Sequence, residues 1–248
     1  MLSRFVFLCS CLFVTTFLSA QQKGYYRCPA INGNTVVFTA EGDLWKYNVA
    51  TGIAMRLTTD DGLEQNPTIS PDGKTVVFTG QYEGISELYS MNINGGVPKR
   101  ITWNFDGYSI QAYSWTKDGK LLYRTAAYSP IPMSQLVKLD INTGDKEVLP
   151  LFQASYGCYN DNNMLYFTRF QNQGSKTKRY KGGLIEQVWK FDGKTEAQNL
   201  TGDFEGTSTD PMYYNSRIYF LSDLDGTMNL WSMNGDGKDL KQQTFSKG

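Results

Sequence analysis

One apolar triplet occurs five times along the chain, and its first residues lie 40, 45, 44 and 53 positions apart. The triplets are Val36-Val37-Phe38, Val76-Val77-Phe78, Leu121-Leu122-Tyr123, Leu165-Tyr166-Phe167 and Ile218-Tyr219-Phe220. All three positions are apolar, without the polar alternation of a half-exposed strand. Each triplet therefore predicts a strand that is covered on both faces.

Two further blocks follow each triplet. The first alternates in polarity, as in a strand nearer the surface, and covers residues 43–47, 87–91, 135–139, 187–191 and 229–233. The second is short and covers residues 56–58, 100–102, 147–149, 199–201 and 243–245. Turn signals such as Ser70-Pro71-Asp72-Gly73 separate the blocks. Each unit is therefore predicted to be a meander of four short strands.

This repeat predicts an all-β protein, because no segment keeps a helical period for three turns. A four-stranded antiparallel unit of this length is typical of a β-propeller blade, whose radial packing hides most sheet edges. We predict five blades, at about residues 24–60, 61–107, 108–153, 154–206 and 207–248. The last unit ends where a further blade would begin, so we expect a truncated chain. Such an arc would expose one face of its first blade and one face of its last.

The first 20 residues have the pattern of an export signal. Arg4 precedes a largely apolar run, Phe5–Leu18, and Ser19-Ala20 supplies small residues for cleavage. We predict a signal peptide at 1–20, a mature propeller at 21–248, and a periplasmic or extracellular location without a membrane segment after cleavage. An uncleaved anchor is the alternative.

Charge and cysteine content exclude several classes. The 24 basic side chains balance 24 acidic ones, so a nucleic-acid partner is not expected, since such binding depends on neutralising phosphates. Beyond the signal, Cys28 and Cys158 do not make a disulfide framework. They fall on the first strands of units one and four, and we expect no disulfide between them.

The chain contains no histidine, which excludes Ser-His-Asp and Cys-His catalysis and a His-based zinc site within it. A serine with a lysine base stays formally possible, but no pair is singled out. We predict no catalytic, cofactor-binding or metal-binding residues. Asp223–Asn229 resembles the start of a calcium loop, but its twelfth position is Asn234 where glutamate is required, so a hairpin turn is predicted there.

Two groups of residues suggest contacts. Lys176, Lys178, Arg179 and Lys181 cluster in the long loop of the fourth unit, where they could hold the carboxylate of a peptide through charge-assisted hydrogen bonds. The alternative is a solvated loop. Tryptophans occupy one repeat position three times, which favours packing between blades over stacking on a ligand. These are Trp45, Trp189 and Trp231.

Several of these motifs resemble the tricorn protease family. The opening Tyr26-Arg27-Cys28-Pro29-Ala30 and Asp43-Leu44-Trp45-Lys46-Tyr47 are similar to its first blade, and Pro71-Asp72-Gly73-Lys74 to its second. The step Arg179-Tyr180-Lys181-Gly182-Gly183 is more specific to tricorn. Arg217–Gly226 continues the resemblance to the end of the chain. It implies a six-bladed propeller, of which five blades are present here, ahead of a seven-bladed propeller and a serine protease module.

The resemblance implies a non-catalytic role, in which the propeller gates or channels peptides to or from a downstream catalytic module. The expected partners are peptides or a protein, the downstream domains of the same polypeptide, and a second copy in a homo-oligomer. Two alternatives stay open: a TolB-like periplasmic protein-binding propeller, and the propeller of a prolyl-oligopeptidase-type hydrolase.

Overall fold

A computed structural model describes residues 24–105, 110–131, 133–170 and 178–247. The described residues form five sheets and no helix. The strands of the first two sheets are β1 (Arg27–Asn32), β2 (Thr35–Ala40), β3 (Asp43–Asn48) and β4 (Ile53–Arg56), then β5 (Glu64–Ile69), β6 (Thr75–Glu83), β7 (Ile85–Asn92) and β8 (Lys99–Arg100). Those of the third are β9 (Gln111–Trp115), β10 (Leu121–Thr125), β11 (Gln135–Leu139) and β12 (Lys146–Val148). The last two sheets contain β13 (Gly157–Tyr159), β14 (Leu165–Thr168), β15 (Val188–Phe191) and β16 (Gln198–Asn199), then β17 (Ser208–Tyr214), β18 (Arg217–Ser222), β19 (Asn229–Met233) and β20 (Lys241–Gln242).

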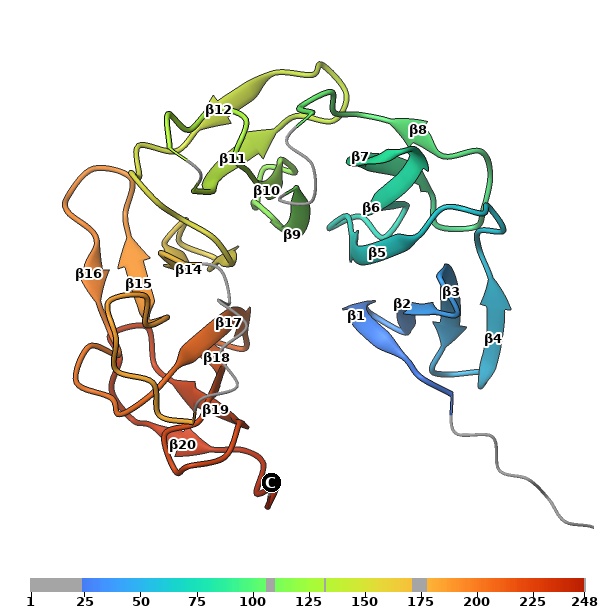
Figure 1. The fold of residues 1–248 in the computed structure, drawn as a ribbon. Helices are drawn as coiled ribbons and strands as arrows, with labels where there is room; N and C mark the ends of the chain where they lie inside the picture. Colours follow the sequence, from blue (N-terminus) through green and yellow to red (C-terminus); the bar gives the residue numbers. More distant parts are fainter. Residues whose placement is uncertain (1–23, 106–109, 132, 171–177, 248) are drawn as a thin grey trace, which may run out of the picture.

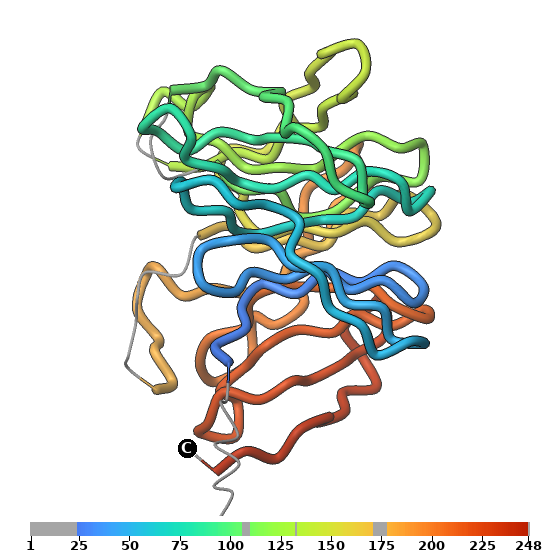
Figure 2. The backbone as a smooth tube through the Cα atoms, turned by 90° about the vertical axis from the view of Figure 1, so that its right-hand side faces the viewer, coloured from blue at the N-terminus to red at the C-terminus, as the bar shows by residue number. Residues whose placement is uncertain are grey.

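Each sheet is an antiparallel meander in chain order, and the five sheets are arranged radially (Figure 1). The first strand of a sheet lies toward the centre and the fourth lies on the rim. Seen from the side, the strands run across the thickness of the disc (Figure 2). The predicted all-β propeller of four-stranded blades is therefore confirmed. The first and fifth sheets lie on either side of an open sector (Figure 1).

The interfaces between sheets use the same repeat positions each time. The middle residue of a triplet and the first apolar residue of the next strand pack toward the following sheet, and we call them the next-facing surface. These pairs are Val37 with Leu44, Val77 with Leu88, Leu122 with Leu136, and Tyr166 with Val188. All eight side chains are buried, because a neighbouring sheet covers them.

The other face of each sheet packs on the sheet before it, and we call it the preceding-facing surface. It consists of the first and third triplet residues and two alternate residues of the third strand. In sheets two to five these are Val76, Phe78, Tyr89 and Met91; Leu121, Tyr123, Val137 and Leu139; Leu165, Phe167, Trp189 and Phe191; and Ile218, Phe220, Trp231 and Met233. Trp189 and Trp231 thus pack between sheets, as the repetition predicted.

The outer sheets each leave one of these surfaces uncovered. In the first sheet, the preceding-facing residues Val36, Phe38, Trp45 and Tyr47 are all partly exposed. In the fifth sheet, the next-facing Tyr219 and Leu230 are also partly exposed. This confirms the expectation that the arc exposes one face at each end.

Bulges interrupt four of the five inner strands, β1, β5, β9 and β17. In β1 the register shifts between Arg27 and Ala30, and it shifts at the corresponding points in β5 and β17. The bulges in β1, β5 and β17 each contain a residue of positive φ followed by proline: Cys28-Pro29, Asn66-Pro67 and Asp210-Pro211, with φ of 50°, 51° and 50°. Proline fits there because a bulged residue leaves the ladder and needs no N–H donor.

A threonine after the fourth strand, buried in the first, second and fourth sheets and exposed in the fifth, closes four of the sheets. Its hydroxyl oxygen accepts the N–H of the next-facing residue at the start of the third strand. The pairs are Thr58 with Leu44 (2.8 Å), Thr102 with Leu88 (2.8 Å), Thr201 with Val188 (2.9 Å) and Thr244 with Leu230 (2.9 Å). The side chain thereby extends the ladder beyond the last backbone pair.

Replacing Thr102 by valine tests this threonine contact. The substitution keeps the shape but removes the acceptor for the Leu88 N–H and the donor to the buried Glu87 carboxylate. Leaving buried groups unsatisfied costs about 1–3 kcal/mol, and we expect the free energy of unfolding to fall by that amount in chemical denaturation. Thr143→Val, at an exposed turn, is the control. Equal stability of the two variants would contradict the assigned role.

Candidate functional site

The longest connections lie on one face of the disc. In a four-stranded meander, the link between the second and third strands and the link to the next sheet leave from the same end. We call this end of the disc the loop face. The β14–β15 connection projects from it, in orange at the left of Figure 2. Connections to the next sheet at residues 57–63, 101–105, 149–156 and 200–207 lie on the same face.

The predicted cation cluster lies in the β14–β15 connection. Lys176 lies outside the described residues, and Lys178 is exposed. Lys181 pairs with Glu205 through its Nζ at 2.9 Å, and the Arg179 guanidinium lies 4.0 Å from the same carboxylate. Lys181 also holds the pKa of Glu205 below its ordinary value. The structure therefore brings Arg179 and Lys181 together, on an acidic partner that sequence analysis did not identify.

Asp223 anchors this connection to the fifth sheet. Its buried carboxylate accepts the backbone N–H of Arg179 at 2.6 Å and that of Thr207 at 2.7 Å. The Arg179 guanidinium in turn donates to the Leu224 carbonyl at 3.2 Å. Residues 223–228 link β18 to β19, so the segment that resembles a calcium loop forms the predicted turn and holds the β14–β15 connection.

We expect Asp223→Ala to release the β14–β15 connection. Two backbone N–H groups lose their acceptor, so trypsin should cleave after Arg179 and Lys181 at least several-fold faster, with little change at other sites. Asp192→Ala provides the control, since Asp192 accepts two N–H bonds of its own turn between β15 and β16. Unchanged cleavage in Asp223→Ala would show that other contacts hold the connection.

A buried arginine lies at the junction of the third and fourth sheets. The Arg124 guanidinium donates to the Ser155 hydroxyl at 3.2 Å. It also lies 5.8 Å from the ring centroid of Tyr113 and 5.5 Å from that of Tyr156. Stacking on aromatic rings stabilises a desolvated guanidinium, so Arg124 on β10 links Tyr113 of β9 to Ser155 and Tyr156, which directly precede β13.

Two buried carboxyl groups and one partly buried carboxyl group lie at the junctions near the loop face. Burial raises the pKa of Glu186 from 4.5 to about 7, against a smaller lowering effect of the Thr209 side chain. Burial also raises the pKa of Asp210, against the lowering effect of Arg124. At the first junction, burial raises the pKa of Glu64 to about 7, against smaller lowering effects of the Tyr82 and Thr58 side chains. The sequence alone gave no sign that these groups are buried.

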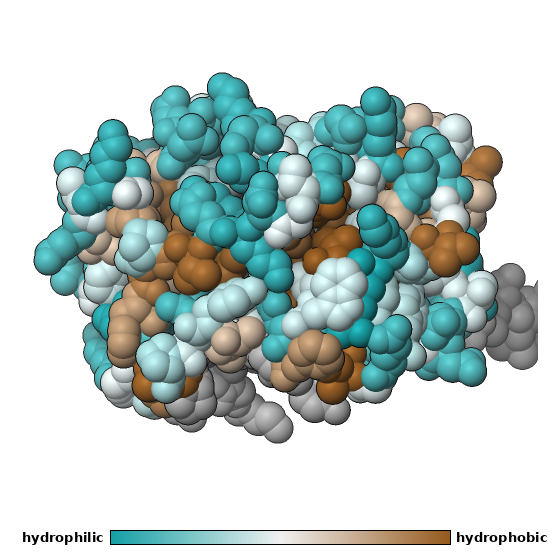
Figure 3. Space-filling view, turned by 90° about the horizontal axis from the view of Figure 1, so that it is seen from above, coloured by the Kyte–Doolittle hydropathy of each residue, from teal (hydrophilic) through white to brown (hydrophobic). Residues whose placement is uncertain are grey.

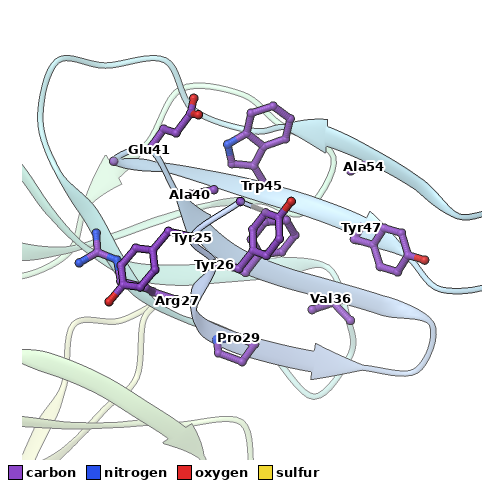
Figure 4. Close-up of a pocket in the computed structure, with 13 residues that line it drawn as sticks. Tyr25, Tyr26, Arg27, Pro29, Val36, Ala40, Glu41, Trp45, Tyr47 and Ala54 are labelled. Carbon is purple, nitrogen blue, oxygen red and sulfur yellow. The ribbon is translucent and has the colours of Figure 1, made fainter. Parts of the chain in front are cut away.

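A large groove lies on the first sheet. It has a volume of about 1060 Å³ and is lined mainly by aromatic and aliphatic side chains, including Tyr26, Phe38, Trp45 and Tyr47 (Figure 4). Tyr26 packs edge-on against Phe38, with ring centroids 5.3 Å apart. The groove is the uncovered preceding-facing surface of this sheet, so Trp45 occupies a packing position that has no neighbour here.

Across residues 24–105, 110–131, 133–170 and 178–247, no group of three His, Cys, Asp or Glu side chains is placed to hold a metal ion. Cys28 and Cys158 are free thiols on β1 and β13, the inner strands where the sequence placed them. The same described residues contain no helix long and apolar enough to cross a membrane.

The fold defines part of a β-propeller. Its exposed charged side chains described above lie in loops, and exposed apolar side chains lie on two uncovered sheet faces. Residues 23–248 match the tricorn protease N-terminal beta propeller domain. The chain therefore belongs to the tricorn N-terminal propeller family, as the sequence resemblance implied.

Individual relatives agree with this assignment. The chain is 31% identical to Tricorn protease homolog 1 of Streptomyces coelicolor over 89% of its own length, but it spans only 21% of that protein. It is also 31% identical to a Putative Tricorn-like protease N-terminal subunit of Sulfurisphaera tokodaii, over 69% of this chain and 88% of that one. The crystal structure of the tricorn protease superposes with a TM-score of 0.78 at 24% identity, over 90% of this chain and 23% of that one.

Proposed function

We propose that this chain is the non-catalytic propeller portion of an exported tricorn-type serine protease, and that it gates or channels peptides for a downstream catalytic module. The family match over residues 23–248 carries the proposal. The absence of histidine from all 248 residues supports it, because a serine protease triad needs a base that this chain does not supply. In a closed propeller the blades surround a central channel, which would provide a path that loops can restrict.

A peptide hydrolysis assay tests whether the propeller is non-catalytic and the catalytic module lies downstream. Purified residues 21–248 should not cleave unstructured peptides, whereas the full-length gene product should. Cleavage by the purified propeller would contradict the non-catalytic role. If the full-length protein cleaves nothing and instead retains a stable envelope protein, the TolB-like alternative is favoured.

Export is a separate part of the proposal and rests on Arg4 and the apolar run Phe5–Leu18. Fusing residues 1–24 to a phosphatase that is active only outside the cytoplasm should give activity. A fusion in which two leucines of the run are replaced by arginine is the control. Equal activity of both fusions, or none from the first, would count against export.

Peptide contact is proposed for the cation cluster of the β14–β15 connection. Arg179 and Lys181 share Glu205, so among the described residues of the cluster Lys178 is the one without an ion-pair partner. A peptide carboxylate at this loop would engage Lys178 first and compete with Glu205 for the other two. Lys178→Glu should weaken binding of a peptide with a free C-terminus and leave binding of its amidated form unchanged.

A further inference from the structure

A pocket of about 640 Å³ lies between the third and fourth sheets. Its walls include the β9–β10 and β15–β16 turns, which lie at the end of the disc opposite the loop face, and residues of β11, β12 and β13. The volume falls within the range of about 300–1,000 Å³ that is typical of small-molecule sites. Both walls belong to sheets inside the arc, each of which has a neighbour on either side (Figure 1).

Two polar contacts cross the equivalent region at the junction of the fourth and fifth sheets. The Lys190 ammonium on β15 donates to Asp236 Oδ1 at 2.7 Å. The Tyr213 hydroxyl on β17 donates to Asp161 Oδ2 at 2.6 Å. Each acceptor lies in a turn of the sheet opposite, so the two hydrogen bonds join the sheets on this side of the disc.

The third junction has the same two donors, but neither makes this contact. Lys138 corresponds to Lys190, because each lies opposite the middle residue of a triplet. Tyr159 corresponds to Tyr213, because each lies opposite the first residue of a triplet. Lys138 Nζ instead binds its cross-strand neighbour Glu147, at 3.2 and 3.4 Å from the two carboxylate oxygens. The Tyr159 hydroxyl has no hydrogen-bond partner among the described residues.

Polar groups with free hydrogen-bonding capacity therefore line the pocket. Burial raises the pKa of Tyr159, and the carboxylates of Glu147 and Asp118 raise it further, so its hydroxyl stays a donor. The exposed Asn163 amide can both donate and accept. Asp192 accepts two N–H groups of its own turn through Oδ1, and its exposed carboxylate has room for further donors.

The charge and the apolar part of the lining limit what the pocket can hold. Two lysines and three carboxylates line it, and Lys138 is already paired with Glu147, so an anionic ligand would meet more carboxylate than free ammonium. Viewed from above, hydrophilic side chains cover most of the outer surface, with smaller apolar patches between them (Figure 3). The pocket adds the buried side chains of Leu149 and Phe191 to its polar rim. It therefore suits a ligand that has an apolar face and uncharged polar groups.

We propose that this pocket binds a polyhydroxylated ring, such as a sugar unit. A hydroxyl both accepts and donates, so adjacent hydroxyls of one ring accept from Tyr159 and donate to the carboxylates of Asp118 and Asp192. The apolar face of the ring packs on Leu149 and Phe191. The bound ring replaces the cross-sheet hydrogen bonds that this junction lacks. This inference is independent of the proposed protease function.

Saturation-transfer NMR of the full-length protein tests which class of ligand binds. The probes are D-glucose, N-acetyl-D-glucosamine and maltose, with L-alanine as a zwitterion that could use the lysine and the carboxylates instead. At least one sugar should receive saturation and give a binding curve on titration, and L-alanine should receive none. Absence of transfer to all three sugars, or transfer to L-alanine alone, would overturn the proposal.

Substitutions place the binding in this pocket. Tyr159→Phe keeps the ring and removes the hydroxyl, and Asn163→Gly removes the amide at a position whose φ of 59° glycine adopts freely. Each should weaken sugar binding about five-fold or more, the usual effect of one lost hydrogen bond. Tyr213→Phe removes the corresponding hydroxyl at the fourth junction and should leave the affinity unchanged. Wild-type affinity in Tyr159→Phe, or an equal loss in Tyr213→Phe, would contradict the assigned site.

Discussion

Phe78→Ala should lower the free energy of unfolding by about 3–5 kcal/mol, the usual cost of removing a phenylalanine from a core. The Phe78 side chain is fully buried between the first two sheets. It is the third residue of its triplet and thus part of a preceding-facing surface that a neighbour covers. Its removal leaves a cavity that the rigid strands on both sides fill only in part.

Phe38 supplies a matched control, since it holds the same repeat position on the first sheet. Its side chain is partly exposed and contacts Tyr26, but no sheet covers it. Phe38→Ala should therefore cost much less than Phe78→Ala when both are measured by denaturant unfolding of dilute protein. Equal losses would mean that the position of a sheet in the arc does not determine its burial.

Glu64→Gln should make stability less dependent on pH. The Glu64 side chain is fully buried, and burial raises its pKa from 4.5 to about 7, although the Tyr82 and Thr58 hydroxyl groups lower it by less. The carboxylates of Asp43 and Asp60 contribute smaller increases in the same pKa. The folded protein therefore binds the proton more tightly than the unfolded chain does.

The sign of the effect follows from this difference. Below about pH 4.5 Glu64 is protonated in both states and costs nothing. As the pH rises toward 7, the unfolded chain ionises first, and stability falls until the folded protein has also ionised. A difference of this size corresponds to about 3 kcal/mol, so Glu64→Gln should exceed wild type by up to that amount at pH 8 and match it at pH 4.5.

Thermal and denaturant unfolding at pH 4.5, 6 and 8 would measure the effect. Glu196→Gln, at an exposed site, should follow the wild-type profile. Part of the slope should persist in Glu64→Gln, because burial shifts the pKa of Glu186 in the same direction. A wild-type profile that rises between pH 4.5 and 7, or a Glu64→Gln profile that parallels wild type, would contradict the burial of an uncompensated carboxyl group.

The features that the sequence predicted well are local and periodic. The triplets, the alternating blocks and the turn residues identify the four strands of each sheet, because burial on both faces leaves a continuous apolar run. The tryptophan repeat correctly indicated packing, as Trp189 and Trp231 confirm. Repetition was informative here because every internal sheet meets the same neighbours.

What the sequence did not indicate depends on contacts between distant residues. The partner of Arg179 and Lys181 is Glu205, and their loop is anchored by Asp223, 44 residues from Arg179. Burial of Glu64 and Glu186 follows from the junction of two sheets, and neither residue has a repeat counterpart that would draw attention to it. The X-Pro bulges were also missed, because a residue before proline normally favours extended conformations.

The peptide-contact hypothesis illustrates the same limit. A run of four cations suggested a site for an anion, and the structure supplies an internal carboxylate for two of them. Charge patterns in a sequence give the sign of the charge on a loop, but they do not identify which charges are already neutralised by an acidic side chain elsewhere in the fold. The hypothesis for Lys178 stays a prediction until peptide binding is measured.

Hydroxyl-radical footprinting of the phenylalanines tests the five-sheet arc most directly. It is applied to dilute protein that covers residues 21–248. Among the four phenylalanines at the third triplet position, Phe38 should be oxidised, and Phe78, Phe167 and Phe220 should be protected, since their exposed fractions are 0%, 1% and 0%. Protection of Phe38 equal to that of the others, or oxidation of all four, would contradict the arrangement.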